Sequence, residues 1–364
     1  MNSSVGHIAI FLMPERGHVL PALGLIAELV RRGHRVSVPA TAGFTAAVTE
    51  CGATPIPCAT TLPRDLPASL FDAAKLALTE ARAVAPRLEE VFRDDRPDLV
   101  LWDVAAWAGG VVAHRLGVPD VVLEPFLTSN AHWSLAAEVV PARTFGPEAI
   151  RFFTEVHRFV GSALPEFTSG ARRRIALFPR EFQPAGHTFD ERYAFAGHCP
   201  ADRAFQGTWD PPGDRPVVLA TTAAQVCADA ARAMPWHLVA RGPVHSPAPN
   251  VETHEFVPQP AVLRHASVFV TRGGLAGVVE ALHHGVPMIV VPHMTDQRLN
   301  GRRVEELGLG VLLDTVTVDG VRSLVDQLTS DSAISARVGE MRRMMHRADG
   351  CAVAADVVEE ELAR

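Results

Sequence analysis

The chain has 364 residues, 48% of them hydrophobic and 21% charged, and a formal net charge of -7. This composition is typical of globular proteins, and the length favours two domains that each bury a core. The acidic balance argues against nucleic acid as a partner, because that partner requires a basic surface and only short runs such as Arg172–Arg174 occur.

The cysteines and the N-terminal sequence indicate the cellular compartment in which the protein works. The five cysteines are scattered without a Cys-x-x-Cys spacing, which favours a reducing compartment with no disulfide framework and no zinc site. The apolar run 7–13 is short and has no basic flank before it, unlike a signal peptide. No stretch approaches the ~18 apolar residues that span a bilayer. We therefore expect a cytoplasmic protein without a membrane segment.

Apolar and amphipathic segments alternate through the first half. The predicted strands are 8–13, 35–39, 99–102 and 118–123, with shorter strands at 175–178 and 193–196. The predicted helices are 19–32, 44–50, 70–92 and 106–116. This alternation indicates a parallel sheet with helices on both faces.

Residues 198–216 are predicted to be a linker, since Gly, Pro and Asp are frequent there and no apolar period is present. The alternation then resumes. The predicted strands are 217–221, 237–240, 252–257, 268–271 and 288–291, and the predicted helices are 226–233, 260–265, 275–284, 300–307, 319–329, 335–346 and 353–362. We predict an N-terminal domain over 1–197 and a C-terminal domain over 217–347. Residues 348–364 are expected to pack back towards the N-terminal domain.

The turn Glu15-Arg16-Gly17-His18 joins the first strand to the first helix. A histidine there can take a proton from a substrate hydroxyl if a carboxylate binds its other ring nitrogen. Asp103 follows another predicted strand at the same edge of the sheet. A helix-entry turn and an N-cap aspartate explain the same two residues without chemistry, and spacing alone favours that plainer interpretation.

A strand, a Gly273-Gly274 turn, a helix and a second strand follow one another from Val268 to Val291. This unit presents a helix N-terminus to an anion. Arg272, beside the glycines, is either a clamp for a diphosphate or a surface arginine. Glu280, two turns into the helix, either accepts hydrogen bonds from ribose hydroxyls or is solvated.

Other polar and aromatic residues follow predicted strands. Asp296 and Gln297, expected in a polar loop, either hold sugar hydroxyls or begin a helix. The histidines His283, His284 and His293 have no metal-ligand spacing and are interpreted as surface or packing residues. Aromatic residues of the first half belong to the core or line a pocket for an apolar acceptor. They are Trp102, Trp107, Phe126 and Trp133.

Taken together, these residues resemble the GT-B fold glycosyltransferases of family 1, most closely the antibiotic- and macrolide-type enzymes, over nearly the whole chain. The similar segments are Gly17-His18-Val19-x-Pro21, Arg31-Arg32-Gly33-His34, Pro97-Asp98-Leu99-Val100-Leu101-x-Asp103, Phe256-Val257-Pro258-Gln259, the glycine-rich loop through Glu280, Gly285-Val286-Pro287, and Asp296-Gln297 with Asn300. The fold that this resemblance implies is α/β, with two Rossmann-like doubly wound parallel-sheet domains that face a central cleft.

The resemblance implies an inverting transfer of a sugar from a dTDP- or UDP-sugar to a hydroxyl of a hydrophobic natural product, such as a polyketide or macrolide. His18 would be the general base and Asp103 would orient it. The donor residues that it implies are Thr222; Phe256, Val257 and Gln259 at the base; Arg272, Gly273 and Gly274 at the diphosphate; Glu280 at the ribose; and Asp296 and Gln297 at the sugar. The acceptor residues are Trp107, Phe126 and Trp133. The resemblance implies no cofactor and no metal, and a monomer or homodimer.

The chain departs from the family pattern His-x-Gly-x-x-Ser-x-x-Glu. Arg272 replaces the histidine, and we assign the serine position to Val278, which has no hydroxyl. The loop after the first strand of the second half has Thr222-Ala223-Ala224 where Gly-Ser or Gly-Thr is usual. These departures bear on donor affinity and donor identity.

Two other functions stay open. The departures favour a catalytically impaired or auxiliary glycosyltransferase homologue with an altered diphosphate site, whereas the intact His18 and Asp103 oppose it. The Gly273-Gly274-x-x-Gly277 turn also resembles a nicotinamide-dinucleotide fingerprint. A nicotinamide-dependent oxidoreductase is the less favoured alternative, because the Gly-x-Gly-x-x-Gly order is missing and no acidic residue directly ends the strand at Val291.

Overall fold

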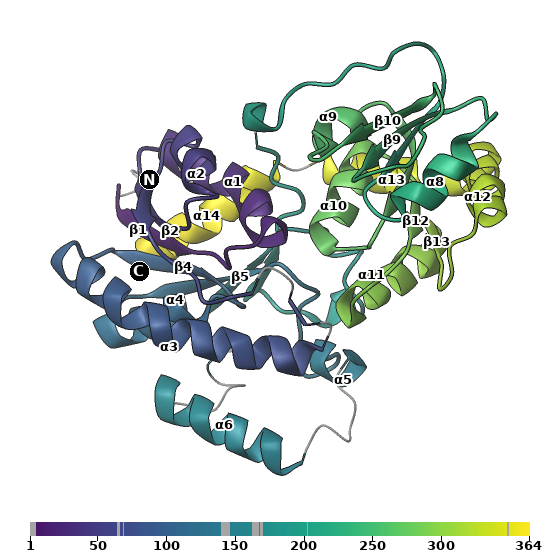
Figure 1. Cartoon of the computed structure of the whole chain (residues 1–364). Helices are drawn as coiled ribbons and strands as arrows, with labels where there is room; N and C mark the ends of the chain where they lie inside the picture. The colour runs from purple at the N-terminus through teal and green to yellow at the C-terminus, as the bar shows by residue number, and fades with distance from the viewer. Residues whose placement is uncertain are drawn as a thin grey trace. The chain divides into compact units, whose positions relative to one another are not determined.

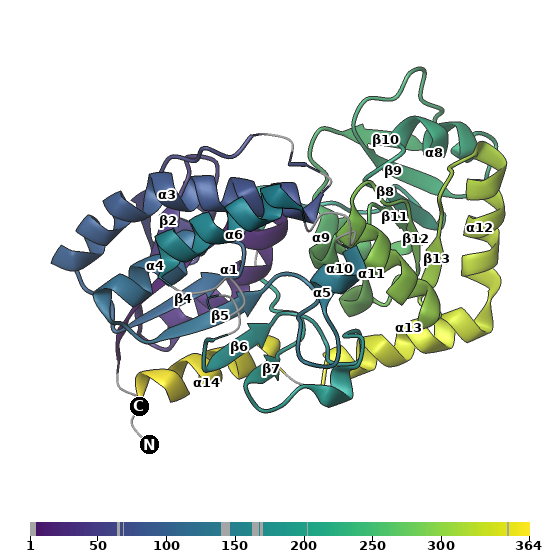
Figure 2. The same ribbon diagram turned by 90° about the horizontal axis from the view of Figure 1, so that it is seen from below.

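The computed structural model describes residues 5–63, 66–67, 69–139, 146–161, 167, 170–201, 203–347 and 349–364. The chain divides into two compact units, Met1–Ala201 with Asp349–Arg364, and Asp202–Ala348. Each unit is a parallel sheet with helices packed on it (Figures 1 and 2). Of the predicted linker, residues 198–201 belong to the first unit and residues 203–216 to the second.

The first unit contains a seven-stranded parallel sheet in the order β3-β2-β1-β4-β5-β6-β7. Its strands are β1 His7–Phe11, β2 Arg35–Ala40, β3 Thr54–Pro57, β4 Leu99–Asp103, β5 Asp120–Glu124, β6 Arg173–Ala176 and β7 Tyr193–Phe195. Every residue of β1 and β4 is buried, as expected for apolar strands covered on both faces. These two strands are neighbours, with Phe11 opposite Trp102, so the segments that leave their carboxyl ends begin side by side.

Helices cover both faces of this sheet. The helices of this unit are α1 Arg16–Arg31, α2 Thr45–Glu50, α3 Leu70–Asp94, α4 Trp107–Leu116, α5 Leu135–Val139, α6 Pro147–Val160, the 3-10 helix η2 Gly186–Thr188, and α14 Gly350–Leu362. One apolar core joins α1, α2 and α14 to the sheet, and a second joins α3, α4 and α6 to its other face (Figure 1). The C-terminal helix α14 is held on α1 by Arg32, which donates to Asp356 at 2.6 Å and to Glu359 at 2.7 Å.

The second unit contains a six-stranded parallel sheet in the order β10-β9-β8-β11-β12-β13. Its strands are β8 Val217–Ala220, β9 His237–Arg241, β10 Val251–His254, β11 Ala266–Thr271, β12 Met288–Val290 and β13 Gly310–Leu312. Its helices are η3 Ala204–Gln206, α8 Ala224–Ala231, α9 Gln259–Leu263, α10 Leu275–His284, α11 Thr295–Glu306, α12 Val318–Ser330 and α13 Ser332–Met345. An apolar core joins α8 and α12 to one face of the sheet, and α10 packs against β11 and against α9, α11 and α13.

Besides the short 3-10 helices η2 and η3, four elements were not predicted from the sequence: β3, β13, α5 and α6. Strand β3 contains Pro55 and Pro57, which are tolerated because β3 lies at the edge of its sheet. Strand β13 is also an edge strand and has only three residues. Helix α6 did carry a signal, since its buried residues Ala149, Phe152, Val156 and Val160 recur every three or four positions.

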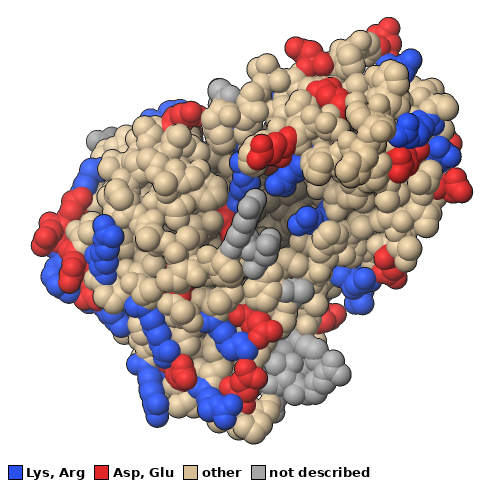
Figure 3. Space-filling view, viewed as in Figure 1, with Lys and Arg blue, Asp and Glu red and all other residues tan. Residues whose placement is uncertain are grey.

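The surface charge and the length of the helices bear on the environment of the protein. On the face that Figure 3 shows, acidic and basic side chains are interspersed. None of the helices in the described part of the chain is long and apolar enough to cross a membrane.

We expect Gly24→Ala to destabilise the first unit. A Cβ at Gly24 would lie 2.5 Å from the carbonyl oxygen of Cys199 and 2.7 Å from that of Pro200, so backbone must move. Overpacking of this kind costs about 1–3 kcal/mol, measurable as a lower urea midpoint. Gly17→Ala, on the same helix, is the control, because nothing lies within 4 Å of its Cβ. Equal midpoints for the two variants would contradict the tight packing of α1 on residues 199–200.

Candidate active site

His18 and Asp103 are joined by a short hydrogen bond between Nδ1 and Oδ2. His18 lies in the first turn of α1, and Asp103 ends β4, the strand beside β1. The other carboxylate oxygen, Oδ1, accepts from the backbone N–H of Ala105 at 2.8 Å. With Asp103 only 1% exposed, the carboxylate is fixed on both oxygens and orients the imidazole. An ionised Asp103 requires the histidine proton on Nδ1, so Nε2 is the basic nitrogen.

Asp103 does not cap a helix, contrary to the plainer interpretation of the sequence. Helix α4 begins four residues later at Trp107, and its N-cap is Ala106. The His18 ring also packs edge-on against Phe126, with ring centroids 5.2 Å apart and an interplanar angle of 77°. The carboxylate and the aromatic ring together restrict the orientation of the histidine.

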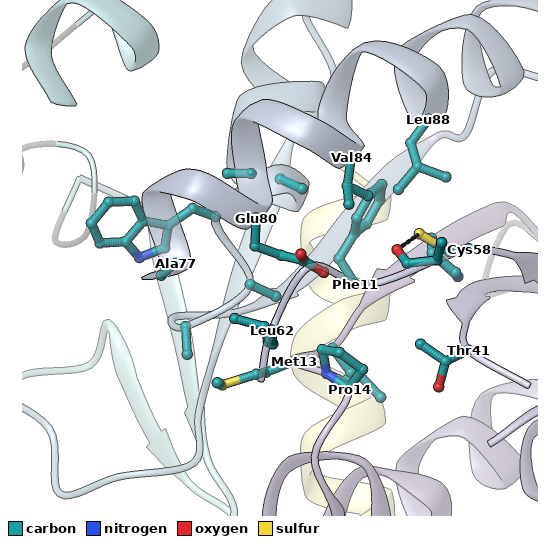
Figure 4. Close-up of a pocket in the computed structure, with 18 residues that line it drawn as sticks. Phe11, Met13, Pro14, Thr41, Cys58, Leu62, Ala77, Glu80, Val84 and Leu88 are labelled. Carbon is teal, nitrogen blue, oxygen red and sulfur yellow. Dashed lines mark hydrogen bonds between the residues drawn. The ribbon is translucent and has the colours of Figure 1, made fainter. Parts of the chain in front are cut away.

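A largely apolar pocket in the first unit encloses about 560 Å³, part of it open to solvent. Its walls come from the chain after β1, including Met13 and Pro14, from the chain after β4, and from α3 (Figure 4). The segments that leave β1 towards His18 and β4 after Asp103 thus form part of the wall, although His18 and Asp103 are not among the described lining residues. Such a pocket suits an apolar small molecule.

The three predicted acceptor residues have different positions. Trp107 lines the pocket, and its indole Nε1 donates to the carbonyl of Val104 at 3.0 Å. Phe126 contacts His18 and is not among the described lining residues. Trp133 is half-buried and also lies outside that lining, in a turn where its backbone N–H donates to Asn130 Oδ1 at 2.9 Å.

In the second unit, Glu280 is buried rather than solvated, with 4% of its surface exposed. Its Oε1 accepts from Arg203 Nη1 at 2.5 Å, and its Oε2 accepts from Gln259 Nε2 at 2.7 Å. The hydrogen bond between Gln259 and Glu280 joins two residues that the family resemblance assigned to the nucleotide-sugar donor. Sequence reasoning missed Arg203, because it lies in a segment without any periodic pattern.

The loop Arg272-Gly273-Gly274 connects β11 to α10 and is held rigidly. Gly273 has φ +84, and a Cβ there would lie 2.6 Å from Val290 Cγ1, so only glycine fits. The carbonyl of Gly273 accepts from Asn300 Nδ2 at 2.9 Å. Arg272 is exposed and has no hydrogen-bond partner among the residues described, so its guanidinium is available to an anion.

His293, interpreted from the sequence as a surface or packing residue, follows β12, the strand beside β11. Partial desolvation, and then the positive charge of Arg272, lower the pKa of His293. The two side chains are therefore close enough to interact electrostatically. No pattern of spacing signalled this pair, because it depends on the pairing of the two strands.

The structure corrects three predicted placements. Asp296 and Gln297 lie in the first turn of α11, not in a loop. The Oε1 of Gln297 accepts from the backbone N–H groups of His293 at 2.9 Å and Met294 at 3.2 Å, which stabilises the helix start. Assigning the family serine to Val278 was wrong, because Val278 is 0% exposed and packs in the core. Counted from Arg272 to Glu280, the serine position is Gly277, which also lacks a hydroxyl.

The remaining predicted donor residues follow strands at the same edge of the sheet. Thr222 is buried in the loop after β8. Phe256, 54% exposed, and Val257, buried, lie between β10 and α9. In the described part of the chain, no group of three or more His, Cys, Asp or Glu side chains is arranged to hold a metal ion.

Comparison with known proteins gives consistent matches. The family model for the erythromycin biosynthesis protein CIII-like C-terminal domain matches residues 223–360. The NDP-glycosyltransferase YjiC of Bacillus licheniformis is 34% identical, with 98% of each chain covered. The oleandomycin glycosyltransferase of Streptomyces antibioticus is also 34% identical, over 98% of this chain and 91% of its own. The solved structure of the kitacinnamycin glycotransferase has a TM-score of 0.86 at 35% identity, covering 98% of this chain and 99% of its own.

We expect Gly277→Ser to strengthen nucleoside diphosphate binding. A Cβ there would lie 3.6 Å from Gln259 Nε2 and 3.7 Å from Phe269, which are ordinary contacts, so the side chain fits. One added hydrogen bond is worth about threefold to tenfold in Kd, measured by calorimetric titration with dTDP and UDP. Gly277→Ala supplies the Cβ without the hydroxyl. If the alanine variant binds as tightly as the serine variant, the hydroxyl does not contact the ligand.

Proposed function

Because the chain belongs to the GT-B fold family 1 glycosyltransferases of the antibiotic and macrolide type, which use nucleotide-diphosphate sugars, we propose that it transfers a sugar with inversion to a hydroxyl of a hydrophobic natural product. The observation that carries this proposal is the His18–Asp103 hydrogen bond at the two strand ends that also form the apolar pocket. The pocket would hold the acceptor, and the second unit would hold a dTDP- or UDP-sugar.

In this proposal His18 is the general base. Its Nε2 takes the proton from the acceptor hydroxyl while that oxygen attacks the anomeric carbon from the face opposite the diphosphate. The new carbon–oxygen bond forms as the bond from that carbon to the diphosphate oxygen breaks, and the nucleoside diphosphate leaves with the electron pair. Asp103 stabilises the imidazolium that results and does not itself take the proton.

The donor half of the proposal rests on the loops of the second unit. Glu280 already accepts from Arg203 and Gln259, yet each carboxylate oxygen has a second lone pair for a ribose hydroxyl. Because Oε1 of Gln297 accepts two backbone N–H groups, this residue would offer its amide NH₂ to the sugar beside Asp296. Phe256 and Val257 would flank the nucleotide base, and Thr222 would close the site after β8.

The leaving diphosphate needs no metal in this proposal. Arg272 supplies a permanent positive charge, and the backbone N–H groups at the start of α10, after Gly273 and Gly274, add donors. His293, which follows the neighbouring strand β12, would add a further donor at this edge of the sheet. Preorganised donors of this kind stabilise a leaving anion as it forms.

A second candidate function is a catalytically impaired or auxiliary homologue that binds donor poorly. Two observations favour it: Gly277 lacks the family hydroxyl, and both oxygens of Glu280 are engaged within the chain. Titration with dTDP and UDP separates the two candidates. Binding of neither nucleotide would exclude the transferase proposal.

Removing the general base tests the proposed chemistry. We expect His18→Ala to lower kcat by about 10²- to 10⁴-fold, with the Kd for the nucleoside diphosphate unchanged. Asp103→Asn keeps a hydrogen-bonding group but no longer favours the required tautomer, so a comparable loss is expected. Product formation is followed by mass spectrometry with dTDP- and UDP-sugars and hydroxylated aromatic or macrolide acceptors. His157→Ala, at an exposed position of α6, is the control. Full activity in His18→Ala would show that the assigned base is wrong.

A diphosphate site without a metal ion predicts that sugar transfer does not depend on divalent cations. Initial rates are expected to be unchanged after dialysis against EDTA, since Arg272 and backbone N–H groups act on the diphosphate in place of a cation. A rate that falls in EDTA and returns with Mg²⁺ would contradict the assignment of the diphosphate site.

A further inference from the structure

The apolar pocket of the first unit contains a single charged side chain among the lining residues that the structure describes. Glu80 enters it from α3, whereas the rest of the lining is apolar apart from small uncharged groups such as Thr41 and Cys58 (Figure 4). Glu80 does not belong to the proposed proton transfer, which uses His18 and Asp103. Its role in the pocket therefore requires a separate explanation.

The carboxylate of Glu80 is held in position without being neutralised. Its Oε2 accepts from the backbone N–H of Thr61 at 2.6 Å and also from the Thr61 hydroxyl. Its Oε1 accepts no hydrogen bond from any residue that the structure describes, and no Lys or Arg among them forms an ion pair with Glu80. One oxygen is thus anchored to the chain, and the other is available to a ligand.

A ligand that fills this pocket displaces water from the carboxylate. Desolvating an ionised group is unfavourable unless a partner replaces the lost hydration, and a charged donor replaces it best. A wholly apolar molecule leaves Glu80 without such a partner. A molecule with an ammonium group satisfies the charge while its frame contacts the apolar walls.

We propose that Glu80 is a specificity-determining residue that selects acceptors with a protonated amine on an otherwise apolar frame. This inference rests on the proposed function in that it takes the pocket to be the acceptor site. The walls of the pocket include Pro14, close in sequence to His18, and Ala105, which is hydrogen-bonded to Asp103. The amine would bind at the α3 side while the hydroxyl faces His18, so the two groups occupy different ends of the acceptor.

Two naphthols that differ only in charge test the proposal. The probes are 6-(dimethylaminomethyl)-2-naphthol and 6-isobutyl-2-naphthol, in which a protonated nitrogen replaces a CH group of the same shape. Binding is followed by naphthol fluorescence, without any nucleotide-sugar donor.

Wild-type protein is expected to bind the amine about tenfold or more tightly than the neutral probe, as a hydrogen bond to a charged partner implies. Glu80→Gln is expected to remove this ratio while the neutral probe binds at least as tightly as before, because the desolvation penalty of the carboxylate is gone; that binding also reports that the variant is folded.

Glu90→Gln is the matched control, because Glu90 is exposed on the same helix and lies outside the described lining. It is expected to keep the wild-type ratio. Equal affinity of wild-type protein for the two probes, no binding of either, or equal weakening of both in Glu80→Gln would overturn the proposal. Transfer is assayed separately with dTDP- and UDP-sugars. If the ratio depends on Glu80 but no sugar is transferred to any acceptor, the proposed function fails and the selection of amines stands.

Discussion

The hydrogen bond between His18 and Asp103 depends on the placement of β1 beside β4 in a parallel sheet. Their carboxyl ends therefore meet at one edge, and the two short segments that follow bring a histidine and a carboxylate into contact across 85 positions of sequence. Both strands are completely buried, so the positions of these side chains are fixed by the core of the first unit. The apolar pocket has the same origin, since the chain after each strand forms part of its wall.

In the second unit, too, the carboxyl ends of neighbouring parallel strands meet at one edge of the sheet. The residues that follow these strands are polar and suit a nucleotide. Arg272 and His293 follow the neighbouring strands β11 and β12, and Asn300 donates a hydrogen bond to the carbonyl of Gly273. Glu280 extends from the helix that begins at this loop and is buried with two donors already bound. These contacts preorganise the loops before any ligand arrives, so binding does not need to order them.

Much of the fold was predictable because the long helices α1 and α3 and the buried strands β1 and β4 have clear apolar patterns. The edge strand β3 escaped prediction because its prolines argue against a strand unless its place at the edge is known. His18, Asp103 and Glu280 were identified as candidates from their positions relative to strands and glycines. Glu80 and Arg203 were not, because their roles depend on contacts between distant segments. The choice of Val278 was a counting error, because the pattern from Arg272 to Glu280 puts the serine position at Gly277.

In the proposed reaction His18 deprotonates the acceptor hydroxyl during a direct displacement at the anomeric carbon. The most direct test is the anomeric configuration of the product made from an α-linked donor such as UDP-glucose, determined from the proton coupling constant at the anomeric carbon. A single displacement, with attack from the face opposite the diphosphate, predicts a β-linked product. An α-linked product would contradict this account, because retention requires either two displacements or attack from the side of the leaving group.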